Sequence, residues 1–200
     1  MILVNPFLYI TTVFFKFYIE KIRNIFSDNY SSGRDLAKYL LVNRITGNIV
    51  LICKKDEESV NESAAGFESF IKNERNDKFV IKGTIYTTAT KKDLKEQLTK
   101  FKDSDIDTCF CVSDDLAKLA AQELDNIYIL SMGGSPDGKQ MVSDKRIAAT
   151  VNQFPLLMGE NAVKGAYNIL EGKYNAPTVI VPSKIITINT VDLHNMDKWE

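Results

Sequence analysis

Gln153 stands at a junction where its side chain has no obvious local structural task. It follows a predicted strand at residues 146–151 and precedes a Phe-Pro pair at which a new helix is expected to begin. A primary amide both donates and accepts hydrogen bonds. We therefore interpret Gln153 as a ligand-binding or hinge residue.

Two other polar stretches invite a chemical interpretation, and for both a structural one is favoured. Asp114 begins the stretch "DDLAKLAAQEL", and aspartate is among the preferred helix N-caps. We expect it to cap a helix at residues 115–124 rather than to contact a ligand. The "GGSPDG" loop at residues 133–138 lacks the Lys-Ser/Thr pair of a phosphate-binding loop, so a plain turn is predicted.

Composition excludes several classes of function. Lys and Arg total 25 against 26 for Asp and Glu, and without a basic stripe no direct nucleic-acid partner is expected. The three cysteines, Cys53, Cys109 and Cys111, lack zinc-ligand spacing and are interpreted as buried thiols. With a single histidine and no paired nucleophile, we predict a protein that is not an enzyme and has no cofactor or metal site.

The N-terminal segment, residues 1–24, is nearly all apolar from Ile2 to Ile19 and leaves the localisation open. Asn5, Pro6 and Lys16 interrupt the apolar run, and no Lys or Arg precedes it as in a signal peptide. A buried strand followed by a helix and a signal or membrane anchor are both compatible with this pattern. No small-residue cleavage site and no lipobox cysteine follows it.

The middle of the chain alternates between two kinds of pattern. Short apolar runs typical of buried strands alternate with segments of helical periodicity. This order predicts an α/β fold with a doubly wound parallel sheet, whose ligands lie at the carboxyl ends of the strands. The expected strands are residues 48–53, 79–87, 107–112 and 126–132, and the expected helices are residues 31–42, 60–75, 91–101 and 113–124.

Beyond Met132 the pattern predicts a crossing between two lobes. Pro155 opens a helix that ends at Gly172. The extended run at residues 176–188 contains Pro182, which a central strand could not accommodate. A bent run suits a segment that passes from one lobe to another.

Five stretches carry a resemblance to a known family. They are "FSDNYSSGRDLAKYL", "AAGFESF", "VSDDLAKLA", "GGSPDG" and "ATVNQFPLLMGENAVKGAYNILEGK". In this order and spacing the chain resembles the ribose-binding-protein group of type I periplasmic binding proteins, relatives of the lactose-repressor effector domains. The resemblance implies two α/β lobes that close on a sugar and deliver it to an ABC transporter permease or a sensor protein. It also implies a periplasmic or cell-surface location, and it matches Gln153 to a ligand-binding glutamine at a hinge crossover.

The resemblance assigns the parts of the chain to lobes. Residues 25–152 match a complete α/β lobe, and residues 153–182 match a helix and strand of the other lobe. Residues 183–200 match a crossover strand and tail, and residues 1–24 a first-lobe remnant or an anchor. Family members carry roughly a hundred residues before the "SDN" motif, so a truncated first lobe is expected here. Self-association is expected to cover the apolar surface left by such a loss.

The site implied by the resemblance departs from the family pattern. Gln153 and Asp114 are retained, whereas Ser63, Ser113 and Gly133 stand where the family has arginine, asparagine and aspartate. Lys91 stands where the family stacks an aromatic ring. Each missing charged hydrogen bond costs about 1.5 to 3 kcal/mol, so we expect a sugar to bind weakly if at all. Lys91 would favour an anionic or smaller solute.

Two further functions remain open from the sequence. One is the effector-binding domain of a transcriptional regulator without its DNA-binding head, because no helix-turn-helix pattern with a basic face precedes Phe26. The other is a structural or dimerising module that has kept the fold and lost the ligand.

Overall fold

The computed structural model describes residues 24–44, 46–73, 78–101, 103–173 and 178–199. The apolar N-terminal segment, residues 1–23, therefore lies outside the described residues. The chain forms two compact units. Unit 1 comprises residues 1–27 and 155–181, and unit 2 comprises residues 28–154 and 182–200.

Unit 2 is built on a sheet whose described strands follow the order β3-β2-β4-β5-β6-β8. The first five of these strands are parallel, as the sequence predicts. The edge strand β8, for which the sequence predicts no direction, pairs antiparallel with β6. The strands are β2 (Gly47–Lys54), β3 (Phe79–Thr87), β4 (Thr108–Cys111), β5 (Tyr128–Gly133), β6 (Ala149–Asn152) and β8 (Lys184–Thr187).

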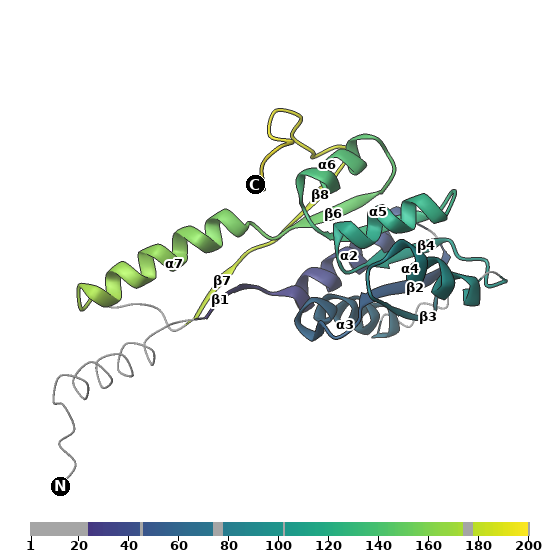
Figure 1. Cartoon of the computed structure of the whole chain (residues 1–200), viewed down its shortest axis with the longest axis horizontal. Coiled ribbons are helices and arrows are strands. Elements are labelled where there is room, and N and C mark those ends of the chain that lie inside the picture. Colours follow the sequence, from purple (N-terminus) through teal and green to yellow (C-terminus); the bar gives the residue numbers. More distant parts are fainter. Residues whose placement is uncertain (1–23, 45, 74–77, 102, 174–177, 200) are drawn as a thin grey trace, which may run out of the picture. The chain divides into compact units, whose positions relative to one another are not determined.

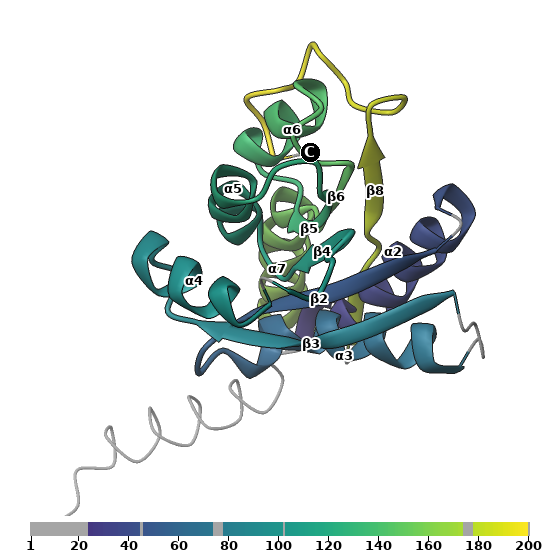
Figure 2. The same cartoon turned by 90° about the vertical axis from the view of Figure 1, so that its right-hand side faces the viewer.

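Helices cover both faces of this sheet, which confirms the predicted doubly wound α/β class. Figures 1 and 2 show α2 (Asn29–Asn43) and α3 (Glu58–Asn73) on one face. The other face carries α4 (Lys91–Leu98), continued by a 3-10 turn at Thr99–Phe101, then α5 (Asp114–Glu123) and α6 (Pro136–Ser143). The direction of winding thus changes between β2 and β4, the second and third strands in the order of the sheet.

Helix α6 contradicts the prediction of a plain turn at "GGSPDG". Ser135 is its N-cap and accepts a hydrogen bond from the Gly138 N–H, while Pro136 occupies the first turn. Proline is well suited to that position because the first turn of a helix leaves its N–H groups unpaired. The loop therefore turns the chain and also opens a helix.

The core of unit 2 explains the apolar runs in the sequence. Strand β4 is buried along its whole length, and β2 is buried except at Asn48 and Lys54. Phe67 of α3 stacks on Phe110 of β4, with ring centroids 4.6 Å apart. Cys53, Cys109 and Cys111 are buried free thiols, as predicted. A Cβ on Gly33 would collide with the carbonyl oxygen of Ser63, so α2 and α3 pack backbone against backbone.

Unit 1 has a simpler structure in its described part. Strand β1 (Asn24–Ser27) pairs in parallel with β7 (Thr178–Val181), and α7 (Pro155–Leu170) contacts both strands. Pro182 lies between β7 and β8, which belong to different sheets. No helix in the described ranges is long and apolar enough to cross a membrane.

Candidate functional site

A cavity of about 260 Å³ opens in unit 2 at the carboxyl ends of its strands. Lys54, Val112, Gly133 and Gln153 reach it from the ends of β2, β4, β5 and β6. The cavity thus lies beside the change in winding direction between β2 and β4, where open α/β sheets bind their ligands. Its other lining residues are Asn29, Val60, Ser63, Ser113, Asp114, Asp115, Met132, Ser135 and Trp199.

The cavity brings together all but one of the predicted site residues. Ser63, Ser113, Asp114, Gly133 and Gln153 all line it. Lys91 does not: it begins α4, after the edge strand β3, and its Nζ forms an ion pair with Glu123 at 3.3 Å. The structure thus does not bring Lys91, the cation expected from the sequence, to this cavity.

Gln153 is held in place by a neighbouring amide. Its Nε2 donates a hydrogen bond to Oδ1 of Asn29, and the two atoms are 2.5 Å apart. The Nδ2 of Asn29 in turn donates to the Ser59 carbonyl at 2.9 Å. This chain of bonds links the end of β6 to the first turns of α2 and α3. It fixes the orientation of the Gln153 amide at the edge of the cavity.

Asp114 is a buried structural centre, and the prediction that it caps α5 is wrong. The cap is Ser113, whose Oγ accepts from the Leu116 N–H at 3.4 Å. Oδ1 of Asp114 instead accepts from the hydroxyls of Ser131 and Thr150, at 2.6 and 2.7 Å. Its Oδ2 accepts from the N–H and the hydroxyl of Ser135, at 2.9 and 2.7 Å. These four hydrogen bonds replace the hydration that the carboxylate loses on burial. Because the donors come from different segments, the carboxylate holds the loops around the cavity together.

Gly133 has a backbone conformation that suits glycine alone. Its φ is +143°, a region that other residues rarely adopt. A Cβ at this position would also lie only 2.5 Å from Oδ2 of Asp114. No aspartate fits at position 133 unless Asp114 moves.

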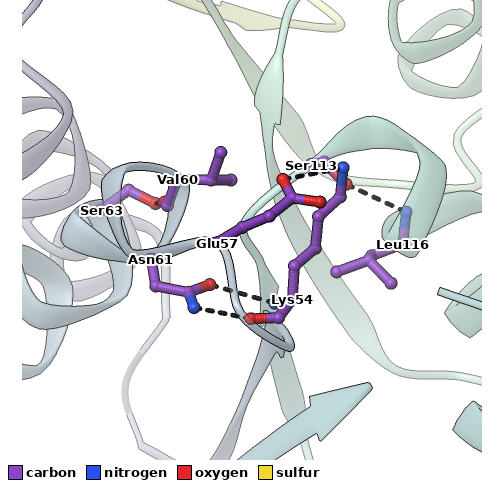
Figure 3. Close-up of polar contacts among 7 residues, drawn as sticks. All are labelled: Lys54, Glu57, Val60, Asn61, Ser63, Ser113 and Leu116. Atoms are coloured by element: carbon purple, nitrogen blue, oxygen red, sulfur yellow. Dashed lines mark hydrogen bonds and ion pairs between the residues drawn. The ribbon is translucent and has the colours of Figure 1, made fainter. Parts of the chain in front are cut away.

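Lys54 is a site residue that sequence reasoning missed. It is the last residue of β2, and its backbone N–H and carbonyl are both bonded by the side-chain amide of Asn61, at 3.0 and 2.7 Å. Figure 3 shows its side chain extending toward Ser113, with Nζ 3.5 Å from Oε2 of Glu57. Its position at the end of a central strand was the signal that could have identified it.

The serine hydroxyls around the cavity are largely engaged within the protein. Ser63 donates to the Val60 carbonyl at 2.9 Å, and Ser135 donates to Asp114 while it accepts from Gly138. Ser113 uses its oxygen as an acceptor for Leu116, so its O–H remains a donor for a ligand. The cavity therefore offers a ligand fewer hydrogen bonds than its composition indicates.

Comparison with known proteins identifies the family to which this fold and this cavity belong. Residues 20–174 match the family described as periplasmic binding protein domain. The chain belongs to this family. The curated relatives that it resembles are ribose import binding proteins.

Curated relatives match part of the chain. The ribose import binding protein of Bacillus subtilis is 31% identical over 87 residues, which are 42% of this chain and 28% of that protein. Its Escherichia coli counterpart is 30% identical over 74 residues, covering 34% of this chain and 25% of that protein.

Solved structures of the family share the fold over most of the chain. A glucose-galactose binding protein from Geobacillus stearothermophilus gives a TM-score of 0.73 at 20% identity, over 86% of this chain and 64% of that one. An ABC transporter solute binding protein from Agrobacterium vitis, bound with α-D-tagatopyranose, gives 0.76 at 17% identity, over 85% and 60%. The chain therefore spans less than two thirds of the length of these family members.

The buried thiols take no part in this periplasmic-binding-protein site. Desolvation by burial raises the pKa of Cys109 to about 12, and desolvation also dominates the raised pKa of Cys53, again about 12. A thiol with so high a pKa is protonated at neutral pH and is a poor nucleophile or metal ligand. In the described part of the chain, no group of three or more His, Cys, Asp or Glu side chains is arranged to hold a metal ion.

Proposed function

We propose that this chain recognises a small neutral polyol or sugar for an ABC-type import system. The observation that carries the proposal is the convergence of Lys54, Ser113 and Gln153 on one cavity at the carboxyl ends of central strands. Family membership supports it, as do relatives named for ribose import and a structural neighbour bound to tagatose. Ammonium, hydroxyl and amide groups together offer the mixture of donors and acceptors that hydroxyl-rich ligands require.

The charges around the cavity favour a neutral ligand over an anion. The preference for anions expected from the sequence depended on Lys91, which does not line the cavity. The lysine that does line it, Lys54, is paired with Glu57. The remaining ionisable side chains of the lining are Asp114 and Asp115, both acidic. An anion would meet one shared cation and two carboxylates.

We further propose that binding is weak. Much of the hydrogen-bonding capacity of Ser63, Ser135 and Asp114 is already used inside unit 2. A ligand that displaces water from such groups gains little, because its hydroxyls lose hydration without finding equivalent partners. A dissociation constant of about 1 mM corresponds to about 4 kcal/mol of binding free energy, which a few direct hydrogen bonds account for.

The partner implied by this function is a membrane permease or a sensor protein outside the cytoplasm. The curated relatives are ribose import binding proteins, and the matching family is described as a periplasmic binding protein domain. We propose the same compartment for this chain. Direct binding of nucleic acid is not part of the proposal, because the chain carries a net charge of −1.

Titration calorimetry tests the proposal. D-ribose, D-galactose and D-tagatose are titrated into the chain, with ribose 5-phosphate as the anionic comparison. We expect at least one neutral sugar to bind with a dissociation constant of about 1 mM or somewhat below, and the phosphate to bind more weakly than ribose. Tighter binding of the phosphate would contradict the preference for neutral ligands. Absence of heat with every neutral sugar would contradict the function itself.

A further inference from the structure

Trp199 lines the cavity from a part of the chain far from the predicted site. It belongs to the C-terminal tail, here residues 188–199, which follows β8 and runs past α6 (Figure 2). Among the described residues that line the cavity it is the only aromatic one. Its side chain is partly open to water, since the residue is 45% exposed.

A buried lysine holds this tail in place. Lys139 of α6 is only 2% exposed, and its Nζ donates hydrogen bonds to the carbonyls of Asn195 and Lys198, at 3.0 and 2.7 Å. Lysine is almost never fully buried unless its charge has partners. The lysine therefore fixes the residue directly before Trp199.

The tail has its own turn, and its anchor shares a helix with the cavity. Asp192 accepts from the His194 N–H at 2.9 Å and from Nδ2 of Asn195 at 2.7 Å. Helix α6, which carries Lys139, is capped at its N-terminus by Ser135, and Ser135 lines the cavity. One short helix thus connects the tail anchor to the site.

We propose that Trp199 is the aromatic wall of the solute site and that Lys139 is the residue that positions it. One face of a sugar ring presents C–H groups and is apolar, and an indole offers a flat apolar surface with one N–H donor. The other apolar lining residues, Val60, Val112 and Met132, are smaller or flexible. Trp199 therefore selects ligands that carry a ring over open-chain polyols. The inference rests on the proposed function and extends it to ligand shape.

The sole tryptophan of the chain makes the positioning role measurable without a ligand. Acrylamide quenching of its fluorescence is compared between the wild type, Lys139→Met and Lys92→Met. Lys92 is an exposed lysine of α4 and serves as the matched control. We expect Lys139→Met to raise the quenching constant about two-fold, because the tail loses both bonds to its carbonyls, and Lys92→Met to leave it unchanged. Equal quenching in all three proteins would overturn the positioning role.

Calorimetry with D-galactose and with the open-chain polyol D-sorbitol tests the binding role. We expect Trp199→Ala to weaken galactose binding about ten-fold, Trp199→Phe about three-fold or less, and neither change to alter sorbitol binding. If the wild type binds galactose and Trp199→Ala binds it equally well, the aromatic wall is wrong and the proposed function stands. If the wild type binds no neutral sugar, both are wrong. Should Lys139→Met fail to fold, as judged by circular dichroism, the Trp199 variants decide the question alone.

Discussion

The carboxylate of Asp114 occupies the space that a side chain at Gly133 would need, since a Cβ there would lie 2.5 Å from Oδ2. Gly133 also has a φ of +143°, which penalises any other residue. We therefore expect Gly133→Ala to lower the free energy of unfolding by about 2 to 4 kcal/mol, through backbone strain and steric overlap together. Urea denaturation followed by circular dichroism measures the loss.

Gly159→Ala is the matched control for this substitution. Gly159 lies inside α7 with nothing within 4 Å of a built Cβ, so alanine should be neutral or stabilising there. Equal stability of Gly133→Ala and the wild type would show that the loop relaxes easily. It would also remove the structural reason for a glycine at position 133, where the resemblance to the family implies an aspartate.

Asp114→Asn tests whether this carboxylate holds the loops of the cavity together. The carboxylate accepts four hydrogen bonds, whereas an amide replaces one acceptor oxygen with a donor. The NH2 group would then face donors such as Ser135, and we expect about 3 kcal/mol of destabilisation. The control is Asp137→Asn, which breaks a surface ion pair with Lys118 and should cost at most about 1 kcal/mol. Similar losses in the two variants would argue against a structural centre at Asp114.

The sequence predicted which residues meet at the cavity better than it predicted their local contacts. Ser113, Gly133 and Gln153 reach the cavity because each lies at or just beyond the end of a strand, and parallel strands end at one edge of a sheet. Lys91 follows β3, which is separated from β4 by β2, so the same rule does not bring it to the cavity. Strand order was the missing information.

Local chemistry was harder to predict where two residues could play the same part. Serine and aspartate are both good N-caps, so the sequence "SDD" alone does not show whether Ser113 or Asp114 is the N-cap of α5. The roles of Lys54 and Lys139 depend on tertiary partners, the Asn61 amide and the tail carbonyls. Neither partner lies at a spacing that a periodic pattern reveals.

Alkaline pH should destabilise the protein through its buried thiols. Burial raises the pKa of Cys109 from 9.0 to about 12, whereas the thiol in the unfolded chain ionises near its ordinary value. Between these two values the folded state binds more protons than the unfolded state, so stability falls as pH rises. The slope is about 1.4 kcal/mol per pH unit for each such thiol. The urea concentration at the midpoint of unfolding should therefore decrease as the pH is raised between these two pKa values.

Cys109→Ala provides the comparison for the pH profile. The variant loses one of the titrating thiols, so its stability should fall less steeply with pH than that of the wild type. Parallel profiles would mean that Cys109 ionises in the folded state as easily as in the unfolded state.

Reaction of the cysteines with a thiol reagent at neutral pH should be slow until denaturant is added, because all three cysteines are buried.

Self-association through α7 is a prediction that the structure makes specific. Leu156, Val163 and Leu170 follow one another at intervals of seven residues and are 51%, 72% and 69% exposed. Such spacing puts them on one side of the helix, where a second copy could bury them. We expect the wild type to sediment as a concentration-dependent oligomer and Val163→Lys/Leu170→Lys to shift it toward the monomer. Val42→Lys, at an exposed position of α2, should have no effect. A wild type that stays monomeric at high concentration would contradict this prediction.

Gln153 distinguishes a ligand-binding role from a purely structural one. Its Nε2 donates to Asn29, and Asn29 donates to the Ser59 carbonyl, so Gln153→Ala should lower the free energy of unfolding by about 1 kcal/mol. If Gln153 also contacts the solute, the same change should weaken sugar binding about ten-fold, or about 1.4 kcal/mol. Gln140→Ala removes an exposed amide of α6 that bonds Asp144 and should alter neither quantity by more than about 0.5 kcal/mol.

The two measurements on Gln153→Ala separate the two roles because they respond to different bonds. Loss of stability reports the bond to Asn29, and loss of affinity reports contact with the solute. A variant that is less stable and yet binds sugar as tightly as the wild type would confine Gln153 to bracing α2 and α3. Recognition would then fall to Lys54 and Ser113, whose ammonium and hydroxyl groups also line the cavity. Lys54→Met should in that case cause the larger loss of affinity, because a hydrogen bond from a charged donor contributes about twice as much as one from a neutral donor.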